Sequence, residues 1–338
     1  MAGLRDLARS LGLSVATVSR ALDGQDTVAP ATRERVLAAA RAANYSPNAA
    51  ARRLSKGRSE VVSLVLPTAV GQFNEPLYIQ LLSLIGLALS KRGYDLSLFA
   101  APPGEEEAAL YRRIVESRRA DGLIIVRTRR DDPRVRYLQD VGFPFVCMGR
   151  TDSDRPYAYV DADGEKALHD ATRRVIALGH RRILHLAAPS AFSFAGHRRR
   201  GYLRAMAEAG LEPQVVECVA DEAHGHDAAR SSLAGPGRPT AILAATDRQA
   251  HGVLHAAREA GLVVPRDLSV LGYDNLTASA YTDPPLSSLE LPLADASRKL
   301  ADFVLARIDG VPAEDLQAVL DVVAIDRGSV GPPPSEGA

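Results

Sequence analysis

Residues 14–22, Ser-Val-Ala-Thr-Val-Ser-Arg-Ala-Leu, limit the possible folds of this chain more than any other stretch. Ser14 is a favoured helix N-cap, and the helix that follows has an apolar stripe formed by Val15, Val18 and Leu22. Its opposite face carries small and polar residues, namely Ala16, Thr17 and Arg20. Such a face fits the major groove of DNA and can bond to base edges. An apolar stripe in residues 4–11 and a glycine turn at 12–14 precede it, so the sequence predicts a helix-turn-helix. A helical hairpin at the start of an enzyme is the alternative.

The charge distribution agrees with a nucleic-acid partner. The whole chain has no net charge at pH 7, but residues 1–59 carry 10 Lys and Arg against 4 Asp and Glu, a net charge of +6. The remaining residues carry 31 basic and 37 acidic side chains, a net charge of −6. A basic head on an acidic body is typical of a nucleic-acid-binding module fused to another domain.

The head is expected to continue with a third helix and a short basic segment. Pro30 lies in the first turn of that helix, and Pro47 ends it. Residues 48–57 form about two turns of Ala-rich basic helix, which is too short to persist alone in water. Its one large apolar side chain, Leu54, suits insertion into a minor groove. The alternative is a basic interdomain linker.

The body alternates buried strands with helices. Strands such as 61–66 and 122–126 alternate with helices such as 77–92 and 105–117, and the pattern restarts after residue 161. This alternation predicts parallel, doubly wound sheets in two similar α/β lobes, with a ligand cleft at the carboxyl ends of the strands.

The head resembles the LacI/GalR family of bacterial transcription regulators. The motifs VATVSRAL, TRERVLAAA and NYSPNAAARRL at 15–22, 32–40 and 44–54 match that family in order and spacing, and the body matches at 177–180, 198–202, 238–242 and 270–275. The resemblance implies base contacts from Val15, Ala16 and Arg20 and phosphate contacts from Thr17 and Ser19. In the hinge helix it implies DNA contacts from Ala51, Leu54 and Ser55, with the Leu54 wedges of a dimer opening the central base step.

Three residues depart from the family pattern. Gly3 replaces the usual helix-capping Thr, Asp23 replaces an Asn, and Ser55 stands where relatives often have Lys or Arg. A carboxylate near phosphate is repelled, which disfavours a phosphate contact at Asp23.

The resemblance also implies the fold class and the domain boundaries. We expect an all-α helix-turn-helix head and an α/β body like a periplasmic binding protein, with two doubly wound lobes. The expected segments are a head at 1–47, a hinge at 48–59, an N-lobe at about 60–160 and 286–320, a C-lobe at about 161–285 and 321–330, and a disordered tail at 331–338.

Candidate ligand-binding residues follow the strands. Asp247 and Asp274 come after predicted strands, where carboxylates accept hydrogen bonds from ligand hydroxyls, although Asp247 is equally suited to cap its helix. Arg198 matches the effector-binding arginine of the family. Phe192 and Phe194 are either cleft walls or core, and Ala220 stands where many sugar-responsive relatives have an aromatic residue. The complete set expected to bind the effector is Phe73, Glu75, Tyr78, Arg150, Arg198, Asp247 and Asp274.

Several classes of site and location are not expected. No apolar run reaches transmembrane length and no signal peptide is evident, which predicts a cytoplasmic protein. No catalytic motif occurs, Cys147 and Cys218 are isolated, and no cofactor is implied. His224 and His226 lie among acids but lack a third ligand at a known spacing, so no metal site is expected.

The function indicated is a transcription repressor. We expect a homodimer that binds double-stranded operator DNA and responds to a small effector, a sugar or glycoside, acting as inducer or corepressor. No leucine heptad follows residue 330, which favours a dimer over a tetramer. The alternatives are an activator on the same scaffold, or a sugar-binding protein or enzyme with an incidental basic N-terminus.

Overall fold

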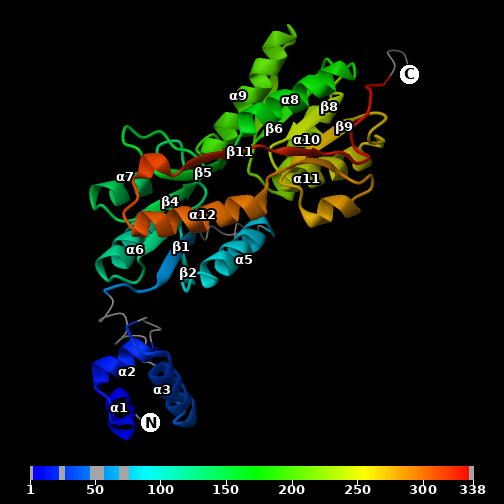
Figure 1. The fold of residues 1–338 in the computed structure, drawn as a ribbon. Coiled ribbons are helices and arrows are strands. Elements are labelled where there is room, and N and C mark those ends of the chain that lie inside the picture. Colours follow the sequence, from blue (N-terminus) through cyan, green and yellow to red (C-terminus); the bar gives the residue numbers. More distant parts are fainter. Residues whose placement is uncertain (1–2, 23–26, 46–56, 68–75, 335–338) are drawn as a thin grey trace. The chain divides into compact units, whose positions relative to one another are not determined.

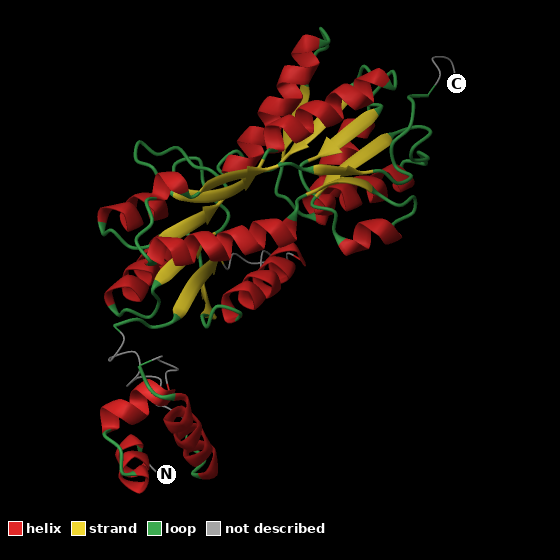
Figure 2. Ribbon diagram, viewed as in Figure 1, coloured by secondary structure: helices red, strands yellow, loops and turns green. Residues whose placement is uncertain are grey.

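The structure is a computed structural model that describes residues 3–22, 27–45, 57–67 and 76–334. The chain forms two compact units, residues 1–59 and 60–338. The helices and strands are shown in Figures 1 and 2. Among the helices described, none is long and apolar enough to cross a membrane.

The described residues of the first unit form three helices. Its helices are α1 (Leu4–Leu11), α2 (Val15–Leu22) and α3 (Pro30–Ala42). Gly12, with φ of +65°, makes the turn between α1 and α2. The Ser14 hydroxyl accepts a hydrogen bond from the Thr17 amide at 3.1 Å, which is the expected N-cap interaction. The helices enclose a core of Leu7, Ala8, Val18, Ala21, Val28, Val36 and Ala40.

One position in α2 differs from the predicted stripe. Val15 is 41% exposed, whereas Val18 and Ala21 are fully buried. Val15 is the first residue of the helix, so it lies beyond the edge of the small core. The buried stripe of α2 therefore starts at Val18, and Val15 lies on the exposed surface with Ala16 and Arg20.

The N-lobe of the second unit is a parallel six-stranded sheet covered on both faces. The strand order is β11-β5-β4-β3-β1-β2. Helices α5 and α12 pack on one face of the sheet, and α6 and α7 pack on the other. The bounds are β1 (Val61–Pro67), α5 (Pro76–Ser90), β2 (Asp95–Ala101), α6 (Glu105–Glu116), β3 (Gly122–Ile125), α7 (Pro133–Asp140), β4 (Phe145–Met148), β5 (Ala158–Ala162), α12 (Leu293–Ile308) and β11 (Gln317–Leu320).

The C-lobe repeats this architecture with one antiparallel edge strand. Its order is β12-β10-β9-β8-β6-β7, and β12 is antiparallel to β10. Helices α8 and α9 cover one face, and α10 and α11 cover the other. The bounds are α8 (Gly164–Ala177), β6 (Ile183–Ala187), α9 (Ser193–Glu208), β7 (Gln214–Glu217), α10 (Glu222–Leu233), β8 (Ala241–Ala244), α11 (Asp247–Glu259), β9 (Ser269–Tyr273), β10 (Ser287–Glu290) and β12 (Val323–Ile325). Short 3₁₀ helices occur at Thr277–Tyr281 and Ala313–Asp315.

Two expected boundaries differ from the structure. Strand β10 at 287–290 pairs with β9, so the second passage between the lobes comes after residue 290 and not near 285. The expected disordered tail starts too early, because Gly331 O accepts a hydrogen bond from His180 Nε2 at 2.8 Å, and Gly331 N donates to Ser269 Oγ at 3.0 Å. These bonds fix the start of that segment to the C-lobe, while 335–338 lie outside the described residues.

The sequence pattern predicts helices at 197–209 and 226–234, whereas α9 begins at Ser193 and α10 at Glu222, about one turn earlier in each case. Asp221 caps α10 by accepting a hydrogen bond from the His224 amide at 2.9 Å. The sequence pattern predicts that the acids and histidines of 221–227 lie in a polar loop before this helix, but they form its cap and first turns.

Helices α10 and α11 pack unusually closely because glycines face each other at their contact. A Cβ added at Gly252 would lie 2.2 Å from Glu222 O, and one added at Gly225 would lie 2.5 Å from Gln249 O. Any larger residue forces the two backbones apart. This close approach brings the outward-facing side chains of the two helices together.

Replacing Gly252 with Ala is expected to lower the free energy of unfolding by about 1–3 kcal/mol, because the added methyl group overpacks the contact. Urea denaturation followed by circular dichroism measures the change. Gly235→Ala is the matched control, since a Cβ there meets no atom within 4 Å, and its effect should stay within about 0.5 kcal/mol. Equal losses for the two variants would contradict the close packing.

Candidate functional site

A cavity of about 180 Å³ lies where the two lobes of the second unit meet. Its lining comes from both lobes and is concentrated at the carboxyl ends of strands: Met148 ends β4, Ala162 ends β5, and Asp274 follows β9. This is the place where parallel sheets bind ligands. The complete lining is Leu77, Tyr78, Arg127, Thr128, Met148, Gly149, Val160, Asp161, Ala162, Pro189, Phe192, Phe194, Arg198, Val219, Ala220, Thr246, Asp274, Leu291 and Ala296.

Arg198 is the central charged group of this lining. It lies on α9 and is 9% exposed, and its guanidinium is 3.4 Å from the centre of the Tyr273 ring. One guanidinium nitrogen donates to Ala245 O, and the other terminal nitrogen is 3.7 Å from Asp274 Oδ1. Burial raises the pKa of Tyr273 to about 12, so the ring beneath the cation stays neutral. Arg198 and Asp274 are thus brought together, as expected from the sequence.

The aromatic wall comes from Phe192 and Phe194. Their rings are stacked, with centroids 5.8 Å apart and an interplanar angle of 14°. Arg127 lies 4.7 Å from the Phe192 ring centre on one side, and Arg198 lies 4.7 Å from Phe194. Both rings line the cavity beside Ala220, so they belong to its wall as well as to a small core cluster.

The lobes contact each other directly beside the phenylalanine wall. Ser193 N donates to Thr128 O at 3.0 Å, and Arg130 N donates to Ala191 O at 3.1 Å. These two bonds form a short bridge between the loop after β3 and the start of α9. The cavity therefore has a fixed edge on this side.

A buried ion network holds the loop after β3. Arg134 bonds to Glu107 at 3.0 Å and to Asp132 at 2.7 Å, and it also donates to Arg127 O at 3.1 Å. Burial opposes ionisation of Asp132, but the hydrogen bonds and charge of Arg134 outweigh it and lower the pKa of this carboxyl. The network fixes the backbone from which Arg127 and Thr128 reach the cavity.

Arg150 lies beside the cavity and not in its lining. Its Nε donates to Asp161 Oδ2 at 2.7 Å, and its Nη2 lies 3.0 Å from His197 Nδ1. Burial lowers the pKa of His197, partly opposed by Asp161, so Nδ1 of the neutral ring accepts from the arginine. Arg150 thereby orients Asp161, a lining carboxylate that the sequence analysis missed because strand β5 was not predicted.

Asp247 has a different role from the one expected. It is fully buried and is absent from the lining of the cavity. Its carboxylate accepts from Leu276 N at 2.7 Å and from the Ser279 and Ser288 hydroxyls, both at 2.6 Å. It does not cap α11 either, because Thr246 accepts from the Gln249 amide at 3.2 Å. With both oxygens satisfied by the protein, Asp247 serves as a structural acceptor.

The bonds of Asp247 fix the turn that carries Asp274. This turn has positive φ at two non-glycine residues, 104° at Asp274 and 49° at Asn275. Leu276 is held by Asp247, and Asn275 N donates to Ser288 Oγ at 3.0 Å. Asp247 is therefore a positioning residue for the Asp274 carboxylate.

The remaining predicted residues divide into described and undescribed positions. Tyr78 lines the cavity. In the head, Ala16 and Arg20 are exposed, and Thr17 and Ser19 are half-buried. The Thr17 hydroxyl bonds to the Ser14 hydroxyl at 2.8 Å. Five further predicted residues lie outside the described part of the chain: Phe73, Glu75, Ala51, Leu54 and Ser55.

Besides Asp161, sequence reasoning missed three other polar lining residues, Arg127, Thr128 and Thr246. Asp247 was chosen because polar residues that follow a strand are candidates for ligand binding. Thr246 also follows strand β8, so the same rule applies to it. Arg127 and Thr128 follow strand β3 in the same way.

Asp247→Ala is expected to lower the free energy of unfolding by about 3 kcal/mol or more, because three buried donors lose their acceptor. Asp247→Asn keeps an oxygen and should lose less. Urea denaturation and amide hydrogen exchange at Leu276 measure the two effects. Asp154→Ala, an exposed carboxylate, is the control and should change stability by no more than about 0.5 kcal/mol. An unchanged exchange rate at Leu276 in the Ala variant would refute the positioning role.

Comparison with known proteins identifies the family. The model of the lacI family of bacterial regulatory proteins matches residues 3–48, and the periplasmic binding protein-like domain matches residues 172–330. The HTH-type transcriptional regulator RafR of Escherichia coli is 35% identical over 317 residues, which cover 93% of this chain and 94% of RafR. CelR of Thermobifida fusca is 33% identical over 332 residues, covering 96% and 97%.

A solved structure of a transcriptional regulator CelR–cellobiose complex superposes with a TM-score of 0.75 and 32% identity, covering 97% of this chain and 99% of the other. The family and fold expected from the sequence are confirmed, and both of these relatives are named as transcriptional regulators. The chain therefore belongs to the LacI family of bacterial regulatory proteins and is a transcription regulator with a helix-turn-helix head.

Proposed function

We propose that this regulator is a repressor whose affinity for operator DNA is controlled by a carbohydrate bound between the two lobes. The observation that carries the proposal is the composition of the cavity wall, in which Arg198 and Asp274 lie next to stacked phenylalanines. A sugar presents hydroxyl groups that both donate and accept hydrogen bonds, and C–H faces that pack on aromatic rings. The cavity offers a partner for each of these groups.

Different residues of the cavity wall would make different contacts with the carbohydrate. Arg198 donates to ligand oxygens, while Asp274 and Asp161 accept from ligand hydroxyls. The phenylalanine rings form the apolar wall, together with Val219 and Leu291. CelR, solved with cellobiose, supports a carbohydrate as the ligand class. We propose Phe73 and Glu75 as further contacts.

We propose that the regulatory form is a homodimer on a two-fold operator, located with the DNA in the cytoplasm. Val15, Ala16 and Arg20 would contact bases, and Thr17 and Ser19 would contact phosphates. Two copies of a helix-turn-helix bind two half-sites one or more helical turns apart. The hinge contacts proposed for the segment 48–59 are those of Ala51, Leu54 and Ser55. No catalytic step is required.

Control by a ligand requires unequal affinity for two states of the regulator. An inducer binds the DNA-incompetent arrangement more tightly, and a corepressor binds the DNA-competent one. Coupling of this kind is typically about 1–3 kcal/mol, or 5–150-fold in operator affinity. The direction of the change in operator affinity on adding sugar distinguishes the two.

Arg198→Ala is expected to abolish the effector response while operator binding survives. The experiment first finds a stabilising sugar by thermal shift and then measures the change in operator affinity that this sugar causes, by fluorescence anisotropy. Arg199→Ala is the matched control, because Arg199 is the exposed neighbour on the same helix. An unchanged response in Arg198→Ala would refute the assigned pocket, and a chain that responds to no sugar would refute the ligand class.

Arg20→Ala is expected to weaken binding to the preferred duplex by about 1–3 kcal/mol, because a base-edge contact is lost. A duplex selected from random sequences by the protein is compared with an unselected one. Arg41→Ala removes one exposed charge at the end of α3 and should affect both duplexes alike. Binding of the wild type should also weaken steeply with salt through counterion release. Salt-independent binding would refute the proposed DNA interface.

A further inference from the structure

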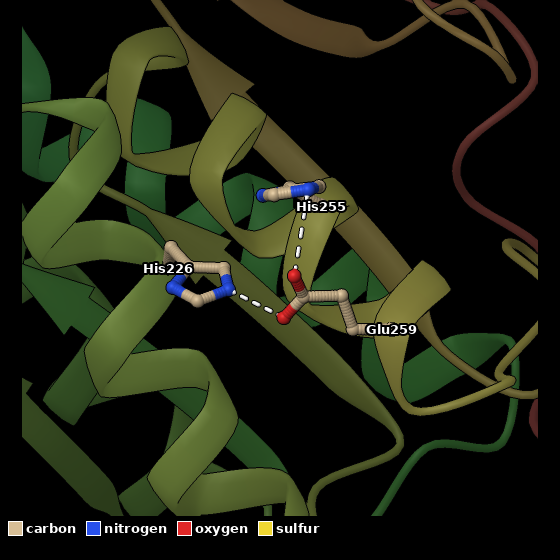
Figure 3. A group of neighbouring side chains, drawn as sticks. All are labelled: His226, His255 and Glu259. Carbon is tan, nitrogen blue, oxygen red and sulfur yellow. Dashed lines mark hydrogen bonds and ion pairs between the residues drawn. The ribbon is translucent and has the colours of Figure 1, made fainter.

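We infer that His226, His255 and Glu259 form a binding site for a divalent transition-metal ion of the zinc class on the outer helices of the C-lobe. His226 projects from α10, while His255 and Glu259 project from α11 (Figure 3). Each side chain offers one ligand atom, and the three atoms all lie within 4.8 Å of one another. These residues are separate from the lining of the cavity between the lobes.

The distances suit a tetrahedral ion after small side-chain rotations. Glu259 Oε2 lies 2.7 Å from His226 Nε2, and Glu259 Oε1 lies 3.6 Å from His255 Nε2. Ligand atoms bound to one zinc ion are about 3.4 Å apart, given metal–ligand distances of roughly 2.0–2.1 Å. An ion between the three groups would replace the hydrogen bond between Glu259 and His226 and the longer contact between Glu259 and His255.

The backbone arrangement fixes two of the ligands in register. His255 and Glu259 are four residues apart on α11, so their side chains lie one above the other on the same helix face. The third ligand reaches them because Gly225 and Gly252 let the helices approach closely. The imidazole centres of His226 and His255 are 5.1 Å apart as a result.

An outer carboxylate orients one ligand. Asp227 Oδ1 lies 3.1 Å from Nδ1 of His226, the ring nitrogen that does not face the site. Histidines that bind metals commonly donate their second ring N–H to such a carboxylate, which fixes the tautomer and leaves Nε2 free for the ion.

The donor set selects the class of ion. Two imidazole nitrogens and one carboxylate oxygen suit Zn²⁺, Ni²⁺ or Cu²⁺, whereas Mg²⁺ and Ca²⁺ prefer sites made of oxygen atoms alone. Three protein ligands leave a fourth tetrahedral position for water. The ion would join α10 to α11 and stabilise the folded C-lobe by mass action.

Sequence reasoning missed this site because two ligands are remote from His226 in the chain. The notable sequence cluster was His224 and His226 with neighbouring acids, but His224 bonds to Asp221 at 2.8 Å in the helix cap. The other two ligands, His255 and Glu259, come from the neighbouring helix, and only the packing of α10 on α11 reveals them.

The test is calorimetric titration of tag-free, EDTA-treated full-length protein with zinc chloride at pH 7.5. We expect one equivalent to bind and the melting temperature to rise, with EDTA reversing the rise. His226→Ala and Glu259→Gln should each weaken binding by tenfold or more and remove the thermal shift. His224→Ala is the matched control, because it removes an exposed histidine of the same helix and leaves the three ligands intact.

Circular dichroism and the melting temperature without zinc check that each variant folds like the wild type. Glu259→Gln has nearly the same shape as the wild-type residue, so it tests the site even if His226→Ala is destabilised. The proposal would be overturned if Glu259→Gln and His226→Ala bound zinc and shifted in melting temperature like the wild type. It would also be overturned if the control His224→Ala lost as much zinc affinity as these two variants. Calcium chloride at the same concentration should give no shift, and a shift equal to that of zinc would contradict the assigned class of ion.

Discussion

The buried guanidinium of Arg198 is the interaction on which the candidate site depends. A charge removed from water must be compensated by hydrogen bonds, an opposite charge or an aromatic face. Arg198 receives all three, from Ala245 O, Asp274 and the Tyr273 ring. These partners come from the ends of β8 and β9, so one cation fixes the relative positions of two strand ends and helix α9.

The N-lobe also has a buried arginine whose charge is compensated, on its side of the cavity. Arg134 is 4% exposed and is held by Glu107 and Asp132, both also buried. Its Nη2 also donates to Arg127 O, at the start of the loop that reaches the C-lobe. Removing either partner of such a buried pair leaves an uncompensated charge, which is costly. Each lobe therefore presents a rigid surface to the cavity.

The sequence predicted the lobes better than it predicted the site. Buried parallel strands such as 61–66 appear as apolar runs of six or seven residues, so the alternation was visible, whereas the edge strand 323–325 has only three residues and is too short to stand out. Arg198 was identified through the family resemblance. Asp247 was predicted to bind the ligand, and the error has a physical cause. A carboxylate that follows a strand has the same sequence context whether it faces a ligand or holds the neighbouring turn in place.

Sequence prediction has a second limit, which is shown by Asp161 and by the pair His255 and Glu259. Asp161 reaches the cavity from a strand that was not predicted, and the other two join His226 only through the contact of α10 with α11. Such sites depend on which elements pack together. Local residue patterns do not contain that information, although they do contain the 3.6-residue period that aligns His255 with Glu259.

The contacts between the lobes are weak enough in free energy for a bound ligand to rearrange them. The bridge beside the phenylalanine wall consists of two backbone hydrogen bonds, each contributing about 0.5–1.5 kcal/mol net. Arg150 and His197 add a polar contact close to the cavity. Rearranging these contacts costs a few kcal/mol, which is comparable with the differential binding energy of an allosteric ligand. A ligand that touches Arg198 on one lobe and Asp161 on the other senses their separation directly, because its hydrogen bonds are good at only one lobe spacing. Rigid lobe surfaces and modest contacts between the lobes together allow binding in the cavity to select one arrangement of the body.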